Sequence, residues 1–272
     1  MKNNDSAAER ITNFISVLKL VEDELFGDAF YEINYRKNVK GRKPIELPNE
    51  EDVQILIDEC EKIMSSTDVF DYSAKSYVPI RSATATFLII FNARRGGEPT
   101  RLAISQWEEA LRGEWVDRDD LPNEYDDSSV LVTYQTGKGV NHLVPVMFPA
   151  ESHKALRYLA DKDVRSRAGI LPSNDYLFPS TQNSPSHSDG WHCINDVLMK
   201  LDKKGAINAT ANRHRVATIL ARLSLTEMEK DMIFKHFGHS KSMNENRYVT
   251  VLYLITTSLK RLKLKKKKTV HE

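Results

Sequence analysis

The sequence predicts a mixed α+β protein that is mainly helical and has a small antiparallel β-hairpin. Apolar residues recur at three- and four-residue spacing over several long segments, which is typical of helices with one buried face. Residues 129–136 and 140–148 instead alternate or run β-branched and aromatic, and Gly137, Lys138 and Gly139 separate them, which favours a hairpin. With 272 residues, 40% of them hydrophobic, the chain can form one large domain or two modest ones, and disorder throughout is excluded.

The first part of the chain predicts a short helical segment and a linker. Residues 8–36 carry helical periodicity, whereas residues 36–44 are basic, contain Gly and Pro, and lack it. We therefore expect a helical segment with a basic linker at 1–44, a main domain at 45–258 and a basic tail at 259–272. The apolar residues of the first periodicity are Ile11, Phe14, Ile15, Leu18 and Val21.

The main domain is expected to begin with a capped helix. Asn49 is an N-cap candidate, and acids follow it in the first turn, where the helix dipole favours them. A second, apolar helix is predicted at 83–92, and this stretch is too short to cross a bilayer. The acidic segment 114–127 and the segment 169–190, rich in Pro, Ser, Asn and Asp, predict loops. Further helices are expected at 194–201, 211–223 and 226–236.

Charge divides the chain although its net charge is only +1. Residues 1–130 carry 16 Lys+Arg and 26 Asp+Glu, whereas residues 131–272 carry 23 and 12. The N-terminus is polar and no apolar run of signal-peptide length follows it, so we do not expect export. The two cysteines, Cys60 and Cys193, fit a reducing compartment, and the lysine-rich tail is of the kind that serves nuclear import or phosphate contact.

Four short motifs hold the residues on which chemistry could depend. Arg95 is followed three residues later by Glu98, and Lys138 stands at the expected hairpin tip. Thr210 precedes Arg213 by three positions in a basic stretch. The last motif is Phe237-Gly238-His239-Ser240, with Tyr248 nine positions after His239.

In this order and spacing, the chain resembles the catalytic domain of the tyrosine recombinases, the phage-integrase family, over about residues 45–258. Its motifs look most like those of Crypton-type mobile elements. The resemblance implies a DNA breaking-rejoining enzyme of the nucleus that acts on double-stranded DNA as a homo-oligomer (dimer or tetramer), with residues 249–262 packing on a neighbouring copy. It implies Tyr248 as nucleophile, with Arg95, Arg213, Lys138, His239 and Thr210 as further catalytic residues. Further DNA contacts are expected from Arg94, Arg215, Lys241 and Arg247.

These residue types suit the cleavage of a phosphodiester. The charge of the phosphate repels an incoming oxyanion, and two guanidiniums over its non-bridging oxygens lower that barrier. A tyrosine with a pKa of about 10 is ionised to about one part in a thousand at pH 7, so the pocket has to be cationic. Lys138 suits a general acid for the leaving 5′-oxygen. Because a 3′-phosphotyrosine at Tyr248 keeps the phosphoester bond energy, neither a metal nor another cofactor is required.

The sequence departs from the family pattern at two places. Thr210 stands where the pattern has a histidine, and a threonine can donate a hydrogen bond but carries no charge. Only about 40 residues precede the catalytic unit, so residues 1–44 are interpreted as a remnant of a core-binding domain. The alternative function is therefore a domesticated DNA-binding protein that keeps the fold with weak or no catalysis.

Taken singly, each motif also has an ordinary structural interpretation. Arg95 with Glu98 is a common helix-surface ion pair, and a lysine between glycines is common in hairpin turns. Tyr253, in an apolar run, competes with Tyr248 but is expected to pack in a helix core. A metal site is not favoured, because the three candidate ligands His187, His192 and Cys193 lack a fourth. The joint order of the motifs is what favours the recombinase interpretation.

Overall fold

The computed structural model of the chain divides into two units, Met1–Glu46 and Leu47–Glu272. The residues that the structure describes are 2–42, 47–66, 74–115, 130–136, 143–181, 183–203, 207–221, 223 and 226. Outside them lie the predicted helix at 226–236 apart from its first residue, the acidic loop from residue 116 on, and the tail at 259–272.

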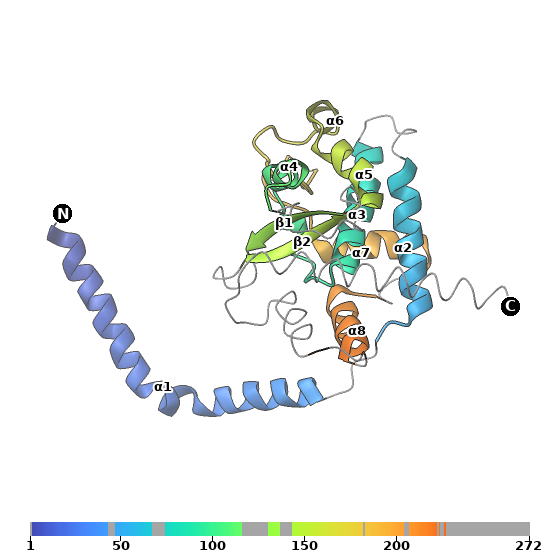
Figure 1. The fold of residues 1–272 in the computed structure, drawn as a ribbon. Helices are drawn as coiled ribbons and strands as arrows, with labels where there is room; N and C mark the ends of the chain where they lie inside the picture. Colours follow the sequence, from blue (N-terminus) through green and yellow to red (C-terminus); the bar gives the residue numbers. More distant parts are fainter. Residues whose placement is uncertain are drawn as a thin grey trace. The chain divides into compact units, whose positions relative to one another are not determined.

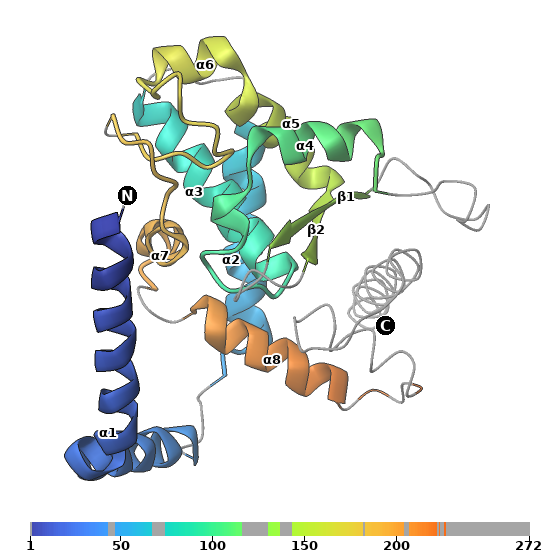
Figure 2. The same ribbon diagram turned by 90° about the vertical axis from the view of Figure 1, so that its left-hand side faces the viewer.

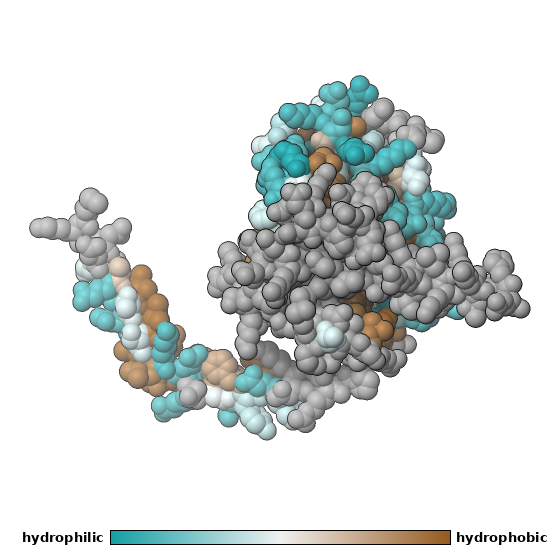
Figure 3. Space-filling model, in the orientation of Figure 1, coloured by the Kyte–Doolittle hydropathy of each residue, from teal (hydrophilic) through white to brown (hydrophobic). Residues whose placement is uncertain are grey.

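The first unit consists of one long helix, α1 (Lys2–Arg42), which bends near its middle (Figure 1). The expectation of a linker from residue 36 on is wrong as far as Arg42, because this stretch is helical. Lys and Arg are good helix formers that complement the negative end of the helix dipole, and one Gly costs only about 1 kcal/mol. Apolar side chains gather along one side of α1 (Figure 3), and many of them are exposed, Phe14 by 66% and Leu18 by 37%.

The second unit is built around α3 (Ala74–Phe91), which packs against α2 (Glu50–Ser65). It also packs against three later helices, α5 (Ala150–Ala160), α7 (Gly190–Lys200) and α8 (Ala209–Ala221) (Figures 1 and 2). The predicted N-cap of α2 is confirmed, since the Asn49 side chain accepts a hydrogen bond from the Asp52 backbone N–H at 2.7 Å. The helix expected at 83–92 starts earlier than predicted. A helix that is buried on most sides shows little amphipathic periodicity, and Pro79 near its start obscures the pattern further.

The remaining elements complete a mainly helical unit with one small sheet. They are η2 (Pro99–Arg101), α4 (Ile104–Arg112), β1 (Val130–Thr136), β2 (Leu143–Pro149), α5 (Ala150–Ala160), α6 (Lys162–Arg167), α7 (Gly190–Lys200) and α8 (Ala209–Ala221). Strands β1 and β2 pair antiparallel, with Val130 opposite Pro149 and Thr136 opposite Leu143. The mixed α+β prediction and its hairpin are therefore confirmed.

One hydrophobic cluster joins α2, α3, α4, β2, α5 and α7. Trp107 of α4 and Phe148 of β2 meet edge to face within it, with ring centroids 5.2 Å apart. Helix α7 packs against α3 and α2 through its buried residues, and α8 meets α3 near its C-terminal end, where Asn212 bonds to Ile90. None of the described helices is both long and apolar enough to cross a membrane. This core fixes the C-terminal end of α3, where the candidate site begins.

Candidate active site around Arg95 and Arg213

The turn after α3 directs two consecutive arginines to different environments. Ala93 has a φ of 49°, in the left-handed region that non-glycine residues rarely adopt, and the chain reverses there. Arg94 is completely buried and donates from Nη2 to the backbone oxygen of Pro145 at 2.6 Å. The Arg94 side chain, expected to contact DNA, is turned inward and holds β2, and its DNA contact stays a prediction. The Arg95 side chain is 46% exposed.

Two buried asparagines fix the elements that meet at this turn. The Asn92 amide donates to the backbone oxygen of Met147 at 3.0 Å, and its Oδ1 accepts from the Met147 N–H at 2.8 Å. Asn212 of α8, also fully buried, donates from Nδ2 to the backbone oxygen of Ile90 at 3.0 Å. Buried polar groups with satisfied hydrogen bonds define a single arrangement, so α3, β2 and α8 are held in register here.

The structure brings together three of the charged residues that the motifs singled out. Glu98, buried with a side chain 3% exposed, accepts a hydrogen bond from Arg95 Nη1 at 3.2 Å. Burial and then the positive charge of Arg95 lower the pKa of Arg213, while the charge of Glu98 raises it. The guanidiniums of Arg95 and Arg213 therefore lie within electrostatic range of each other, beside one carboxylate, although they come from distant parts of the sequence. The net positive charge of this group suits an anion.

Helix α8 also carries Thr210 and Arg215, which occupy different environments. Thr210 is exposed one helical turn before the half-buried Arg213. The Arg215 side chain, 13% exposed, pairs with Glu50 of α2 at 2.5 Å from Nη1 to Oε2. Arg215, predicted to contact DNA, would therefore have to leave Glu50 to reach a phosphate.

The structure does not test the remaining predicted residues. Lys138, His239, Lys241, Arg247 and Tyr248 lie outside the described residues. Their roles stay predictions.

Asn92 and Asn212 stand close to the motif residues Arg95 and Arg213 in the sequence, which indicated no role for them. A buried asparagine needs hydrogen-bond partners. An asparagine next to an apolar helical stretch therefore indicates a buried contact with another segment. The sequence alone did not show that their partners would be Met147 and Ile90. These contacts link segments far apart in the chain.

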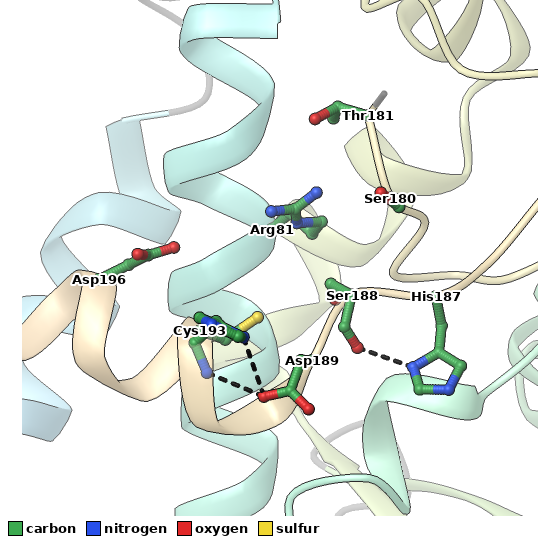
Figure 4. Close-up of a pocket in the computed structure, with 9 residues that line it drawn as sticks. Arg81, Ser180, Thr181, His187, Ser188, Asp189, Cys193 and Asp196 are labelled. Carbon is green, nitrogen blue, oxygen red and sulfur yellow. Dashed lines mark hydrogen bonds and ion pairs between the residues drawn. The ribbon is translucent and has the colours of Figure 1, made fainter. Parts of the chain in front are cut away.

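A polar cavity of about 480 Å³ lies beside the first turn of α7 and is distinct from the arginine pair (Figure 4). Its lining includes Arg81 of α3, which donates from Nη1 to the backbone oxygen of Pro179 at 2.9 Å. His187, His192 and Cys193 also line it, yet no three His, Cys, Asp or Glu side chains of the described segments are grouped so as to hold a metal ion. Neither Arg95 nor Arg213 lines this cavity.

The sequence matches no family model and no curated protein. Two solved structures are similar to the chain. One is the site-specific recombinase XerH bound to its difH substrate in a pre-cleavage complex, with 21% identity over 73% of this chain and a TM-score of 0.44. The other is the XerA recombinase, with 21% identity over 92% of this chain and 81% of its own, and a TM-score of 0.40. The chain covers 48% of the XerH chain, about half of its length. Similarities this low do not establish a shared activity.

Proposed function

We propose that the protein is a DNA breaking-rejoining enzyme of the tyrosine-recombinase type, in which Tyr248 attacks a DNA phosphodiester and forms a 3′-phosphotyrosine. The observation that carries the proposal is the exposed Arg95 paired with the buried Glu98 carboxylate, together with Arg213 of α8, whose charge interacts with both. The same two arginines were selected from motif spacing alone. The electrostatic interaction between the two side chains supports the proposal that they form one site.

The electrostatics of the pair suits a phosphate. Burial and then the positive charge of Arg95 lower the pKa of Arg213, and an anion bound by both guanidiniums offsets the repulsion between their charges. Arg95 is held by Glu98 on one side and is exposed on the other, so it can donate to a ligand without leaving its partner. Guanidiniums preorganised in this way stabilise the charge that develops on non-bridging oxygens during phosphoryl transfer.

The complete reaction also needs residues whose roles we propose from the family resemblance. Lys138 protonates the departing 5′-oxygen, and His239 donates a hydrogen bond to the phosphate. The 5′-hydroxyl of another strand then attacks the phosphotyrosine, displaces Tyr248 and restores a phosphodiester. Because the phosphotyrosine keeps the phosphoester bond energy, the rejoining step needs no energy-supplying cofactor.

A nicked suicide substrate tests the proposal directly. Because the short cleaved fragment diffuses away, the covalent protein–DNA complex accumulates and survives denaturing gels. We expect wild type to form this complex on a pool of nicked duplexes with randomised sequence around the nick, and Tyr248→Phe to form none while binding the same DNA. Tyr253→Phe is the matched control and should react like wild type. Equal complex formation by Tyr248→Phe would falsify the assignment.

The second candidate function is a DNA-binding protein that keeps the recombinase architecture but has lost turnover. It is favoured by one observation, the neutral Thr210 at an exposed position of α8 where the family pattern has histidine. Thr210→His adds an imidazole at that place. Cleavage by the variant but not by wild type supports the second candidate over the first.

We also propose that the protein works in the nucleus, on double-stranded DNA, as a homo-oligomer and as the product of a Crypton-type mobile element. The lysine-rich tail and the motif resemblance support these proposals. Because neutralising phosphates releases counterions, DNA affinity should fall steeply between 50 and 200 mM salt, by about 10³-fold if some six phosphates are contacted. Binding that does not depend on salt would contradict a phosphate-based interface.

A further inference from the structure

The start of α7 lies against the turn that carries Arg95, where Gly190 meets Gly96, and this contact depends on the glycine at 190. A Cβ atom on Gly190, the first residue of α7, would lie 2.2 Å from the backbone oxygen of Gly96 and 2.5 Å from its carbonyl carbon. Cβ atoms do not approach backbone atoms so closely, so any side chain at 190 would force one of the two segments to move. A Cβ on Gly96 would meet Gly190 at an ordinary 3.5 Å.

The turn on the Arg95 side of this contact is held by its own hydrogen bonds. The Gly96 oxygen accepts from Thr100 Oγ1 at 3.2 Å, and Thr100 is fully buried. The Glu98 N–H donates to the backbone oxygen of Arg95 at 2.9 Å. A displacement of Gly96 would therefore also move the backbone of Arg95 and the Glu98 carboxylate that accepts a hydrogen bond from the Arg95 guanidinium.

The α7 side is equally fixed, so the clash cannot be relieved there at low cost. The Asp189 carboxylate caps the helix by accepting from the N–H groups of Trp191 at 2.8 Å and His192 at 3.1 Å. Cys193 and Ile194 in the same turn are buried in the core against α3. The polar cavity of Figure 4 borders this turn through Asp189, His192 and Cys193.

We propose that Gly190 is a positioning residue for the strand-transfer reaction: by letting α7 begin against the Gly96 carbonyl, it fixes the turn that aims Arg95 at the scissile phosphate beside Arg213. The inference rests on the proposed function for its effect on cleavage. It assigns to the start of α7 a role that the sequence motifs did not indicate. Gly190 itself does not touch the DNA; it acts through Arg95.

The test compares Gly190→Ala with Gly97→Ala in the full chain. A Cβ on Gly97 has no atom within 4 Å, so Gly97→Ala changes the same turn without a clash. We expect Gly190→Ala to form the covalent complex with the nicked DNA pool at least tenfold more slowly, and Gly97→Ala to stay within twofold of wild type. Thermal melting shows whether each variant is folded.

A double-variant cycle separates positioning from general damage. If Gly190 acts through Arg95, Gly190→Ala adds little to the loss already caused by Arg95→Ala, because that loss can occur only once. A merely structural role would give multiplicative losses, and that result would overturn the proposal. So would equal rates for Gly190→Ala and Gly97→Ala.

A readout without chemistry keeps this inference apart from the proposed function. The arginine Nε–H resonance of Arg95, assigned by its absence in Arg95→Lys, should shift in Gly190→Ala and not in Gly97→Ala. If wild type forms no covalent complex, the proposed function fails, and the resonance still decides whether Gly190 positions Arg95. Should Gly190→Ala not fold, Thr100→Val removes the hydroxyl bound to Gly96, and an unshifted Arg95 resonance in that variant counts against the coupling.

Discussion

The turn after α3 and the first turns of α8 each carry two arginines, and each uses them in two ways. In the turn, Arg94 is buried and bonded to Pro145, whereas Arg95 is half exposed beside Glu98. On α8, Arg215 pairs with Glu50, whereas burial and then the charge of Arg95 lower the pKa of Arg213. One arginine of each pair stabilises the fold, and the other interacts electrostatically with its counterpart. Burial and partners, rather than position in a motif, distinguish the two kinds.

The largest effect on the cleavage rate is expected for substitutions of Arg95 and Arg213. Arg213→Ala or Arg95→Ala removes one of two guanidiniums from the transition state, and loss of one such donor typically slows the chemical step about 10²–10³-fold. Covalent-complex formation on nicked DNA measures the rate, and melting measures stability, which should change little for the partly exposed Arg95. If either substitution left the rate unchanged, the comparison would lose its basis.

Arg94 should behave in the opposite way. Arg94→Met keeps much of the volume but leaves the buried Pro145 carbonyl without this donor, so we expect a loss of about 1–3 kcal/mol in the free energy of unfolding. Urea denaturation measures it. Wild-type stability combined with lost DNA affinity would show instead that Arg94 serves DNA binding.

A smaller effect is expected for the second fold-stabilising arginine. Glu50→Gln removes the acid that pairs with Arg215, and Glu50 is 56% exposed, so the unfolding free energy should fall by less than about 1 kcal/mol. The variant also releases Arg215. A rise in DNA affinity at low salt would show that Arg215 can contact phosphates once it is free.

The smallest expected effect is on the pH dependence of stability, and it concerns His153, which lies away from Arg95 and Arg213. Burial lowers the pKa of His153, whose Nε2 bonds to the backbone oxygen of Phe148 at 2.8 Å. The neutral ring is favoured in the folded state, so its contribution to stability is complete above about pH 6.5 and is lost as the pH falls through the lowered value. The melting temperature of wild type should therefore fall more between pH 7.5 and 5.5 than that of His153→Gln. An identical pH dependence in the two proteins would show that His153 does not contribute to the loss of stability at low pH.

Sequence patterns predicted the elements whose signal is local. The cap at Asn49, the hairpin and the helices of α7 and α8 follow from capping chemistry and periodicity, and their structures agree. Motif spacing also selected Arg95 and Arg213. The early start of α3 was missed because a buried helix lacks a polar face.

The parts that could not be predicted depend on contacts between distant segments. The spacing to Glu98 selects Arg95 as the site residue, but it does not show that Arg94 is buried; the reversal at Ala93 and the Pro145 carbonyl decide that. The role of Gly190 is equally hidden, because nothing in the local sequence shows that the first residue of α7 has to be glycine and only the approach of Gly96 makes it necessary. The N-terminal helix extends further than predicted, because a basic stretch with one Gly is compatible with both a linker and the C-terminal end of a helix.

The most direct test of the central claim is cleavage of a nicked duplex whose scissile phosphate is replaced by an uncharged methylphosphonate. If Arg95 and Arg213 act on the phosphate charge, Arg213→Ala should slow cleavage of the ordinary duplex by about 10²-fold or more, and this penalty should shrink at least tenfold on the neutral one. A penalty of the same size on both substrates would contradict the account, because the guanidinium would then be acting elsewhere than at the phosphate.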